Sequence, residues 1–166
     1  MIGPRPSRSH EITIPSMPAI IRPESPDTTD ARALIAELEA QLAPFYPQES
    51  RHGYSVEKLI AQEVAFFVIR ANGMPAGCGG LQLFAGYGEI KRMYVRPQFR
   101  GLGLAKLMLS HLADHAVSHH LPLLRLETGI YQQEAIGLYE RMGFYLIPPF
   151  GPYTDDPLSR CYEKRL

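Results

Sequence analysis

The segment of residues 89–105, EIKRMYVRPQFRGLGLA, constrains this chain more than any other part of the sequence. Its first half, Glu89–Arg96, has the composition of a strand, which Pro97 closes. Gly101 and Gly103 then let the backbone bend tightly and bring bare N–H groups against a ligand. A helix that begins immediately afterwards adds unpaired amides and the positive end of its dipole, which together bind phosphate. The segment therefore predicts a site for a pyrophosphate.

Two side chains and two missing motifs narrow the kind of anion site. Gln98 and Arg100 supply donors beside the turn. A Rossmann dinucleotide site would carry a third glycine where Lys106 stands, and a P-loop would need the pattern G-x-x-x-x-G-K-[ST], which the sequence lacks. Two glycines alone are also typical of a plain turn before a core helix, so the interpretation needs support from the rest of the chain.

Composition and charge exclude several classes of protein. The 166 residues suit one compact domain, and Lys plus Arg equal Asp plus Glu at 17 each, so there is no net field to attract nucleic acid or an acidic membrane. No stretch approaches the ~20 apolar residues needed to span a bilayer. Cys78 and Cys161 match no metal or redox spacing and are expected to be free thiols. We therefore expect a cytoplasmic protein without a nucleic-acid or membrane partner.

The proline-rich start of the chain differs from the rest. Residues 1–17, MIGPRPSRSHEITIPSM, lack a continuous apolar core and are predicted to be a flexible tail rather than a secretory signal. Residues 18–166 are predicted to form one domain. Its expected elements are a strand at 19–22, a helix from 27 or 28 to 42, a short helix after 55, strands at 65–71, 76–84 and 89–96, a helix at 103–118, a strand at 123–128, a helix at 132–142 and strands at 144–147 and 160–164. Asp27 or Thr28 is expected to cap the first helix and Ser55 the second, and Asn72-Gly73 predicts a two-residue hairpin. This order predicts an α+β fold with a central mixed, mostly antiparallel sheet and helices on both faces.

Two blocks of residues resemble a known family. Gln98-x-x-Gly101-x-Gly103 matches the Q/R-x-x-G-x-G/A signature of the GNAT acetyltransferases and follows a strand that ends at Val95. The segment EAIGLYERMGF at 134–144 resembles their second conserved block, at the usual spacing. The chain is thus similar to a small, bacterial-type, single-domain GNAT N-acetyltransferase over about residues 18–166. The resemblance implies the GNAT acyl-CoA N-acyltransferase fold.

The same resemblance implies acetyl-CoA as cosubstrate, no metal, and specific roles for residues. Backbone groups of Met93 and Val95 would pair with the pantetheine arm, and amides from Arg100 to Leu104 would hold the pyrophosphate. Tyr139 would be the general acid that protonates the departing CoA thiolate; outside this resemblance it is typical of a half-buried aromatic on an amphipathic helix. The residues implied in cosubstrate binding are Met93, Tyr94, Val95, Gln98, Arg100, Gly101, Leu102, Gly103, Leu104 and Ala105.

A general base is less sharply indicated than the acid. Glu89 opens the central strand, and Glu127 stands near the end of the neighbouring one. Either carboxylate can accept an amine proton through water, and either can instead be an ion-pair partner of Lys91, Arg92 or Arg125. Of the two, Glu89 is the first candidate for the catalytic base. A substrate amine can also lose its proton to bulk water, without any dedicated base.

Acceptor recognition in such folds comes from two loops, one after the first helix and one before the last strand. They contain Tyr46, Glu49, Arg51, His52 and Tyr54, then Phe150, Tyr153, Asp155 and Asp156, any of which can also be a solvated loop residue. The mixture predicts a small, partly apolar amine as substrate. The alternatives are a non-catalytic CoA-binding sensor or interaction module, and an enzyme that acetylates protein N-termini or lysines. A homodimer is compatible with the sequence.

A histidine repeat is the remaining motif of note. His111, His115 and His119 recur every four residues, a spacing that can align imidazoles as metal ligands. They lie to the flank of Leu104, Met108 and Leu112, which their spacing predicts to be the buried stripe of the helix, and only Asp114 supplies a nearby acid. We therefore expect a solvated helix face there rather than a metal site.

Overall fold

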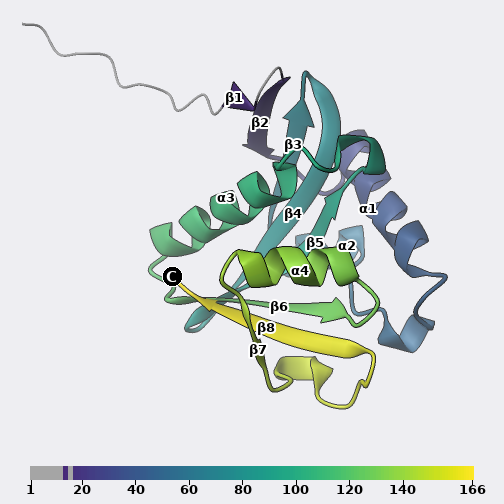
Figure 1. The fold of residues 1–166 in the computed structure, drawn as a ribbon, viewed down its shortest axis with the longest axis vertical. Coiled ribbons are helices and arrows are strands. Elements are labelled where there is room, and N and C mark those ends of the chain that lie inside the picture. The colour runs from purple at the N-terminus through teal and green to yellow at the C-terminus, as the bar shows by residue number, and fades with distance from the viewer. Residues whose placement is uncertain (1–12, 15–16) are drawn as a thin grey trace, which may run out of the picture.

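One mixed sheet runs through the centre of the computed structural model, which describes residues 13–14 and 17–166 (Figure 1). The elements in chain order are β1 Thr13–Ile14, β2 Met17–Pro23, α1 Thr29–Leu42, α2 Val56–Ala61, β3 Ala65–Ala71, β4 Met74–Phe84, β5 Tyr87–Val95, α3 Leu104–Ser118, β6 Leu123–Gly129, α4 Gln133–Arg141, β7 Tyr145–Ile147 and β8 Ser159–Arg165. The strands lie side by side in the order β1-β2-β3-β4-β5-β6-β8-β7. All neighbours are antiparallel except β5 and β6.

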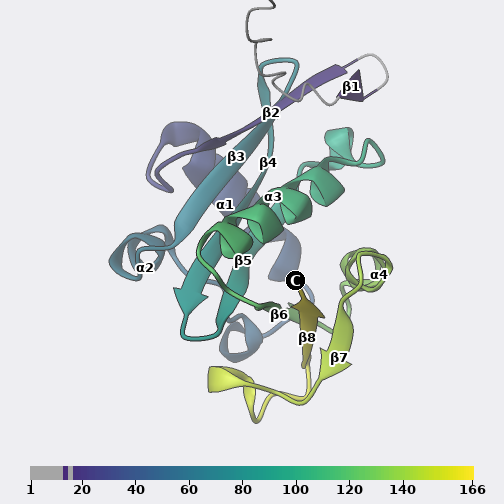
Figure 2. The same ribbon diagram turned by 90° about the vertical axis from the view of Figure 1, so that its left-hand side faces the viewer.

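Helices cover both faces of this sheet. α1 and α2 bury Leu34 and Leu59 against one face, while α3 and α4 bury Met108 and Ile136 against the other. Figure 2 shows the two pairs of helices on opposite sides of the strands. The predicted α+β architecture is therefore confirmed. Within the described part of the chain, no helix is long and apolar enough to cross a bilayer.

The first described strands begin earlier than the apolar pattern indicated. Most of the predicted flexible tail, residues 1–17, lies outside the described residues. Among those that are described, Thr13 and Ile14 form a short strand that pairs with Pro18 and Met17. The strand expected from Ala19 begins at Met17. Backbone pairing, which needs no particular side chain, extends this edge beyond the apolar run that marked it.

Local signals in the sequence account for several element boundaries. The Thr28 side chain accepts a hydrogen bond from the Ala31 amide at 3.2 Å and caps α1, and the Ser55 side chain caps α2 through the Lys58 amide at 3.1 Å. Asn72 and Gly73 adopt φ of +51° and +77°, as the two central residues of a tight hairpin require. These caps and the hairpin position match their predictions.

A β-bulge in β5 was not predicted. Gly80 lies opposite Lys91 but Cys78 lies opposite Tyr94, so β5 contains one more residue than β4 over this stretch. The additional residue falls at Arg92, whose φ of +53° is uncommon for a side chain other than glycine. The bulge breaks the alternation of the strand, so that Lys91 and Arg92 both point to the face covered by α1 and α2, toward Tyr54 and Glu39 respectively.

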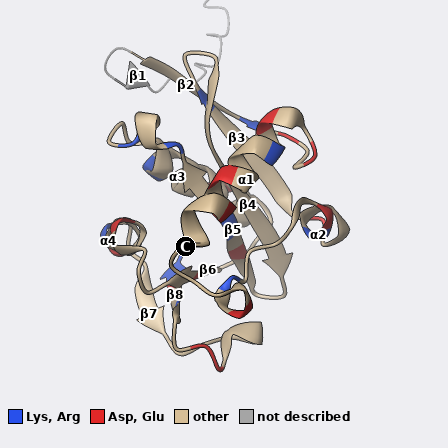
Figure 3. Cartoon of the chain, turned by 90° about the vertical axis from the view of Figure 1, so that its right-hand side faces the viewer, with Lys and Arg blue, Asp and Glu red and all other residues tan. Residues whose placement is uncertain are grey.

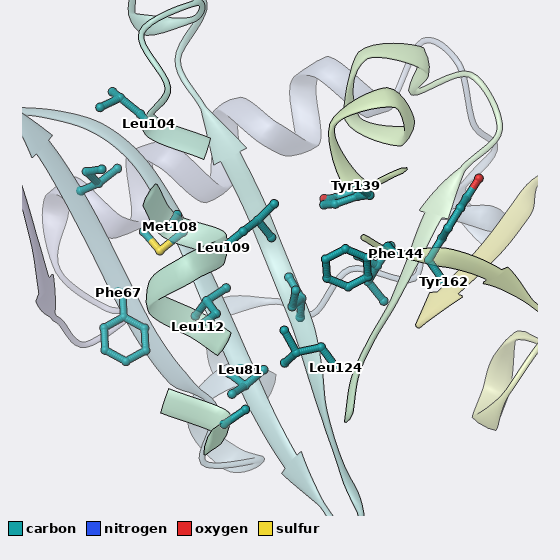
Figure 4. Packing of buried hydrophobic residues seen from close by; sticks show 14 of the residues in the cluster. Phe67, Leu81, Leu104, Met108, Leu109, Leu112, Leu124, Tyr139, Phe144 and Tyr162 are labelled. Carbon is teal, nitrogen blue, oxygen red and sulfur yellow. The ribbon is translucent and has the colours of Figure 1, made fainter. Parts of the chain in front are cut away.

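The larger core lies between α3, α4 and the sheet (Figure 4). Leu104, Met108 and Leu112 form the buried stripe of α3, which matches the predicted amphipathic pattern. Next to it, Tyr139 on α4 packs against the Phe144 ring, with a centroid distance of 5.7 Å. Tyr139, the general acid that the resemblance implies, thus packs in the same hydrophobic core as α3.

Leu112→Ala is expected to lower the free energy of unfolding by about 2–5 kcal/mol, because it removes a fully buried side chain from a packed core. Val117→Ala on the same helix is the matched control, since Val117 is 55% exposed, and should change stability by about 0.5 kcal/mol or less. Urea unfolding followed by circular dichroism measures both. Equal effects of the two substitutions would contradict the assignment of the buried face of α3.

Candidate active site

A cleft opens where β5 and β6 separate. The two strands pair only through Gly88 with Leu124 and Glu89 with Arg125, although β5 continues to Val95. Beyond these pairs lies a cavity of about 800 Å³, lined by residues of β5, β6, α4, the start of α3 and the loop after α1. Among the described residues, most of β5 therefore has no strand beside it on the edge that faces β6.

The edge of β5 presents backbone groups to this cleft. On the other edge, the Arg96 amide donates to the Ala76 carbonyl at 2.8 Å, and Tyr94 lies opposite Cys78 of β4. Adjacent residues of an extended strand direct their N–H and C=O groups to opposite edges, so those of Val95 point toward the cleft. The Val95 carbonyl accepts a hydrogen bond from Nε of Arg100 at 3.0 Å. The Val95 carbonyl thus already has Arg100 as its donor, and the Val95 N–H lies beside it on the edge that faces the cleft.

The glycine turn forms the upper end of the cleft. Gly101 and Gly103 adopt φ of +80° and +81°, in the left-handed region, and an added Cβ would meet no atom within 4 Å. Glycine is therefore required for conformation rather than for space. Leu107 makes the first helical hydrogen bond, to the Gly103 carbonyl at 3.1 Å. The amides of residues 101–106 precede it, and none donates to a backbone carbonyl within the part of the chain described.

The predicted cosubstrate residues occupy three kinds of position. Those that line the cavity are Met93, Tyr94, Val95, Arg100, Gly101, Gly103, Leu104 and Ala105. Gln98 is exposed and Leu102 packs against the core, and neither lines the cavity. The Arg100 guanidinium also reaches Gln41 of α1, in addition to the Val95 carbonyl. Arg100 thus links the turn to α1 and to β5.

Tyr139 contributes its ring to the cavity wall and is only 6% exposed. Its hydroxyl has no hydrogen-bond partner among the described residues. Burial raises the pKa of Tyr139 far above its usual range, and the negative charge of Glu127 raises it further. The phenol therefore stays protonated at neutral pH and has a proton to donate.

Glu89 lies in a buried polar cluster. Its Oε1 accepts hydrogen bonds from Nζ of Lys91 at 2.8 Å and from the Tyr153 hydroxyl at 2.5 Å. The Lys91 ammonium also lies over the Tyr54 ring, 4.1 Å from its centroid. Glu89 lines the cavity, yet its charge is matched by Lys91, as one of the two sequence interpretations expected.

Glu127 lies on β6 across the cavity from β5. It accepts a hydrogen bond from the Ser159 hydroxyl at 2.7 Å. Burial raises the pKa of Glu127, while the hydrogen bond from Ser159 and the charges of His52 and Lys91 oppose that shift. Among the described residues Glu127 forms no ion pair, which distinguishes it from Glu89.

The two predicted acceptor loops meet at the cavity. His52 Nε2 lies 2.7 Å from Oδ2 of Asp156, and the His52 ring packs edge-on against Tyr153 at 5.3 Å. Burial alone would raise the pKa of Asp156. Hydrogen bonds from the Leu158 amide, His52 and Ser50 outweigh burial and hold this pKa below its usual range. The loop residues that line the cavity are Tyr46, Arg51, His52 and Tyr153, whereas Glu49, Tyr54, Phe150, Asp155 and Asp156 do not.

Ion pairs between α1 and β5 were missed by sequence reasoning. Glu37 accepts from the Arg96 guanidinium, with the closest approach at 2.7 Å, and Glu39 pairs with Arg92. Figure 3, with α1 facing the viewer, shows acidic segments along this helix. The partners are more than 50 residues apart, and the only sequence signal is the set of acidic residues on a helix that precedes a basic strand.

The histidine repeat lies away from the cleft. His111 and His115 pack edge-on against Phe67, with centroid distances of 4.5 and 5.4 Å. Burial lowers the pKa of both imidazoles, so the face is less solvated than predicted. In the described residues, no group of three histidine, cysteine or acidic side chains is placed to hold a metal ion.

Comparison with known proteins agrees with this geometry. The chain is 41% identical over 145 residues to the IAA acetyltransferase of Azospirillum brasilense, covering 86% of this chain and 95% of that protein. It is 37% identical over 137 residues to the uncharacterized N-acetyltransferase YsnE of Bacillus subtilis, covering 81% and 91%.

Solved structures and a family model give the same result. A chain from Klebsiella pneumoniae, described provisionally as an acyl-CoA N-acyltransferase, superposes with a TM-score of 0.77 at 39% identity, covering 89% of this chain and 97% of that one. The PaiA N-acetyltransferase of Thermoplasma acidophilum, solved with coenzyme A, shares the fold with a TM-score of 0.71 at 21% identity, covering 89% and 99%. Residues 32–144 match the model of the acetyltransferase (GNAT) family. The chain therefore belongs to the GNAT acetyltransferase family and is an acyl-CoA-dependent N-acetyltransferase.

Proposed function

We propose that this enzyme transfers the acetyl group of acetyl-CoA directly to a primary amine of a small molecule. The observation that carries the proposal is the shared cavity. The bare amides of the glycine turn, the free edge of β5 at Val95, the Tyr139 ring and the Glu127 carboxylate all border one space of about 800 Å³. Acyl transfer to an amine needs an anion site, an oxyanion donor, an acid and a base within reach of one thioester.

The turn and the cleft fit the two ends of acetyl-CoA. Amides of residues 101–106 donate to no backbone carbonyl among the described residues and lie at the start of α3, where the helix dipole favours a pyrophosphate. Between β5 and β6 a slender arm can pair with the exposed backbone of β5. We assign the pyrophosphate to Gly101–Ala105 and the arm to Met93 and Val95. The Val95 N–H then supplies the oxyanion donor.

The proton steps follow from the two perturbed groups. The amine attacks the thioester carbonyl and passes a proton to Glu127 through water, the C–S bond breaks, and Tyr139 donates a proton to the sulfur. The negative charge of Glu127 raises the pKa of Tyr139, so protonation of Glu127 makes Tyr139 a stronger acid. Proton uptake on the amine side therefore promotes proton release on the sulfur side. The proton held by Glu127 then restores Tyr139.

Contacts between the two acceptor loops support a small acceptor. His52 of one loop contacts Asp156 of the other, and the Tyr153 ring covers the polar cluster around Glu89. A protein lysine or N-terminus would need an open groove across these loops. We therefore favour a small-molecule amine, and peptide acceptors are the alternative that an acceptor panel tests.

Tyr139→Phe is expected to lower kcat by about 100-fold, since general acid catalysis contributes about 10²–10⁴-fold, and to leave the KM for acetyl-CoA nearly unchanged. Thiol release from acetyl-CoA in the presence of an accepted amine measures both constants. Tyr145→Phe removes a hydroxyl from an exposed tyrosine of β7 and is the matched control. Unchanged kcat in Tyr139→Phe would remove Tyr139 from the acid role.

Glu127→Gln is expected to lower kcat/KM for the amine by about 100-fold and to abolish the acidic limb of its pH profile. Burial raises the pKa of Glu127, so that limb should lie above the ordinary glutamate range in the wild-type enzyme. Glu89→Gln is the comparison, because it removes the partner of Lys91. A larger loss of kcat in Glu89→Gln, with the fold retained, would assign the base to Glu89.

Glu127→Gln should also stabilise the protein at pH 8. A raised pKa means that the folded state binds a proton more tightly than the unfolded state. Stability therefore falls as pH rises from the ordinary glutamate pKa through the raised pKa of Glu127, and it stays lower at higher pH. Glutamine removes that loss while its amide oxygen still accepts from Ser159. Melting temperatures at pH 4 and pH 8 should show a gain that is larger at pH 8. A lower melting temperature of the variant at pH 8 would contradict the buried carboxylate.

A further inference from the structure

Two arginines border the acceptor end of the cavity. The bulge in β5 directs Arg92 toward α1, where its side chain is only 4% exposed and pairs with Glu39. Arg51, from the loop after α1, has a side chain that is 24% exposed and lies 3.5 Å from the same Glu39 carboxylate. Both arginines line the main cavity and an adjoining hollow of about 310 Å³. One carboxylate thus serves two guanidinium groups.

The hydrogen-bonding capacity of these guanidinium groups is largely unused. Nε of Arg51 and Nε of Arg92 are both buried without a partner among the described residues. A guanidinium has five N–H donors, and the contact of Arg51 to Glu39 is at the limit of a hydrogen bond. Gly53 lies against the Arg92 guanidinium, where any side chain would overlap it. Arg92 is therefore fixed, whereas Arg51 is more exposed and weakly held.

The other charges around the acceptor end are matched in pairs. Lys91 pairs with Glu89 at 2.8 Å, and His52 contacts Asp156 at 2.7 Å. Of the charged residues that β5, β6 and the acceptor loops contribute to the cavity lining, two lack a partner of their own among the described residues: Arg51, which shares Glu39 with Arg92, and Glu127. At this end of the cavity the unmatched charges are therefore one positive and one negative group, whereas the other charged lining residues, Arg100, Lys106, Glu134 and Arg141, lie at the glycine turn, on α3 and on α4. Their complement is a molecule with one anionic and one basic end.

We infer that the acceptor is an amino carboxylate, such as an amino acid, whose carboxylate binds Arg51 and whose amine faces Glu127. This rests on the proposed function, because it names the class of amine that the same cavity acetylates. Arg92 holds Glu39 in place, and Glu39 limits the anion to one negative charge, since it lies against both arginines and repels a dianion such as a phosphate monoester. Arg51 is a specificity residue and takes no part in the proton steps.

The test compares acceptors that differ only in the anionic end. Thiol release from acetyl-CoA is measured with several apolar amino acids, with their carboxamides and with the corresponding decarboxylated amines. For the best amino acid, the wild-type enzyme should show a kcat/KM about 10- to 100-fold higher than for its carboxamide, as a charge-assisted pair would give. Arg51→Gln should remove this preference by raising the KM for the amino acid, with kcat and the KM for acetyl-CoA little changed. Arg51→Lys should restore part of it.

The controls separate this inference from the proposed function. Arg22→Gln removes an exposed arginine of β2 outside the cavity and should keep the preference, and melting temperatures establish that each variant is folded. Acetylation of amines without preference for the carboxylate, or a preference that survives in folded Arg51→Gln, would overturn the inference and leave the enzyme a small-molecule acetyltransferase. Binding of acetyl-CoA without acetylation of any amine, or acetylation of peptides alone, would overturn both.

Discussion

The separation of β5 from β6 is the constraint on which the rest of the site depends. A parallel pair normally continues along the full length of both strands, and here it stops after two residue pairs. Unpaired backbone groups in a protein interior are unfavourable unless a ligand or water satisfies them. The sheet therefore carries an open edge at Val95, and the glycine turn adds further free amides directly after it. The fold tolerates this because β4 holds the other edge of β5 and α3 and α4 fill the space beneath.

A second level of organisation comes from charge pairing across distant segments. Glu37 and Glu39 of α1 reach Arg96 and Arg92 of β5, and Glu89 of β5 reaches Tyr153 near the end of the chain. The Arg92 guanidinium and the Glu89 carboxylate are each only 4% exposed, so removing a partner of either is costly, and these contacts hold α1 and the Tyr153 loop at the cavity. The same interactions decide which charges remain available to a ligand. Some residues of β5 thus hold other elements in place through ion pairs, while their neighbours on the same strand border the cavity where a ligand would bind.

The sequence predicted the parts of this structure that depend on local chemistry. The caps at Thr28 and Ser55, the Asn72-Gly73 hairpin and the helix after Gly103 all match, because each depends on residues within a few positions. Most residues that the resemblance assigns to cosubstrate binding border one cavity together with Tyr139, and their roles stay predictions. Features that depend on contacts between distant residues were not predicted. The bulge at Arg92 and the union of Glu89 with Tyr153 arise from packing against other elements, and no nearby residue signals them.

The bulge also determines what the centre of the sheet can contain. A regular pleat would send either Lys91 or Arg92 into the apolar layer beneath α3, where Met108 and Leu112 leave no room for a cation. Opposite it, Gly79 has no room for a side chain, since a Cβ would come within 2.9 Å of Met108. Deleting Arg92 would restore an even ladder and leave Met93 and Tyr94 on their present faces, but it would also remove the partner of Glu39. The irregularity in one hydrogen-bond register is therefore what allows two consecutive basic residues, Lys91 and Arg92, to lie in a central strand without entering the apolar layer.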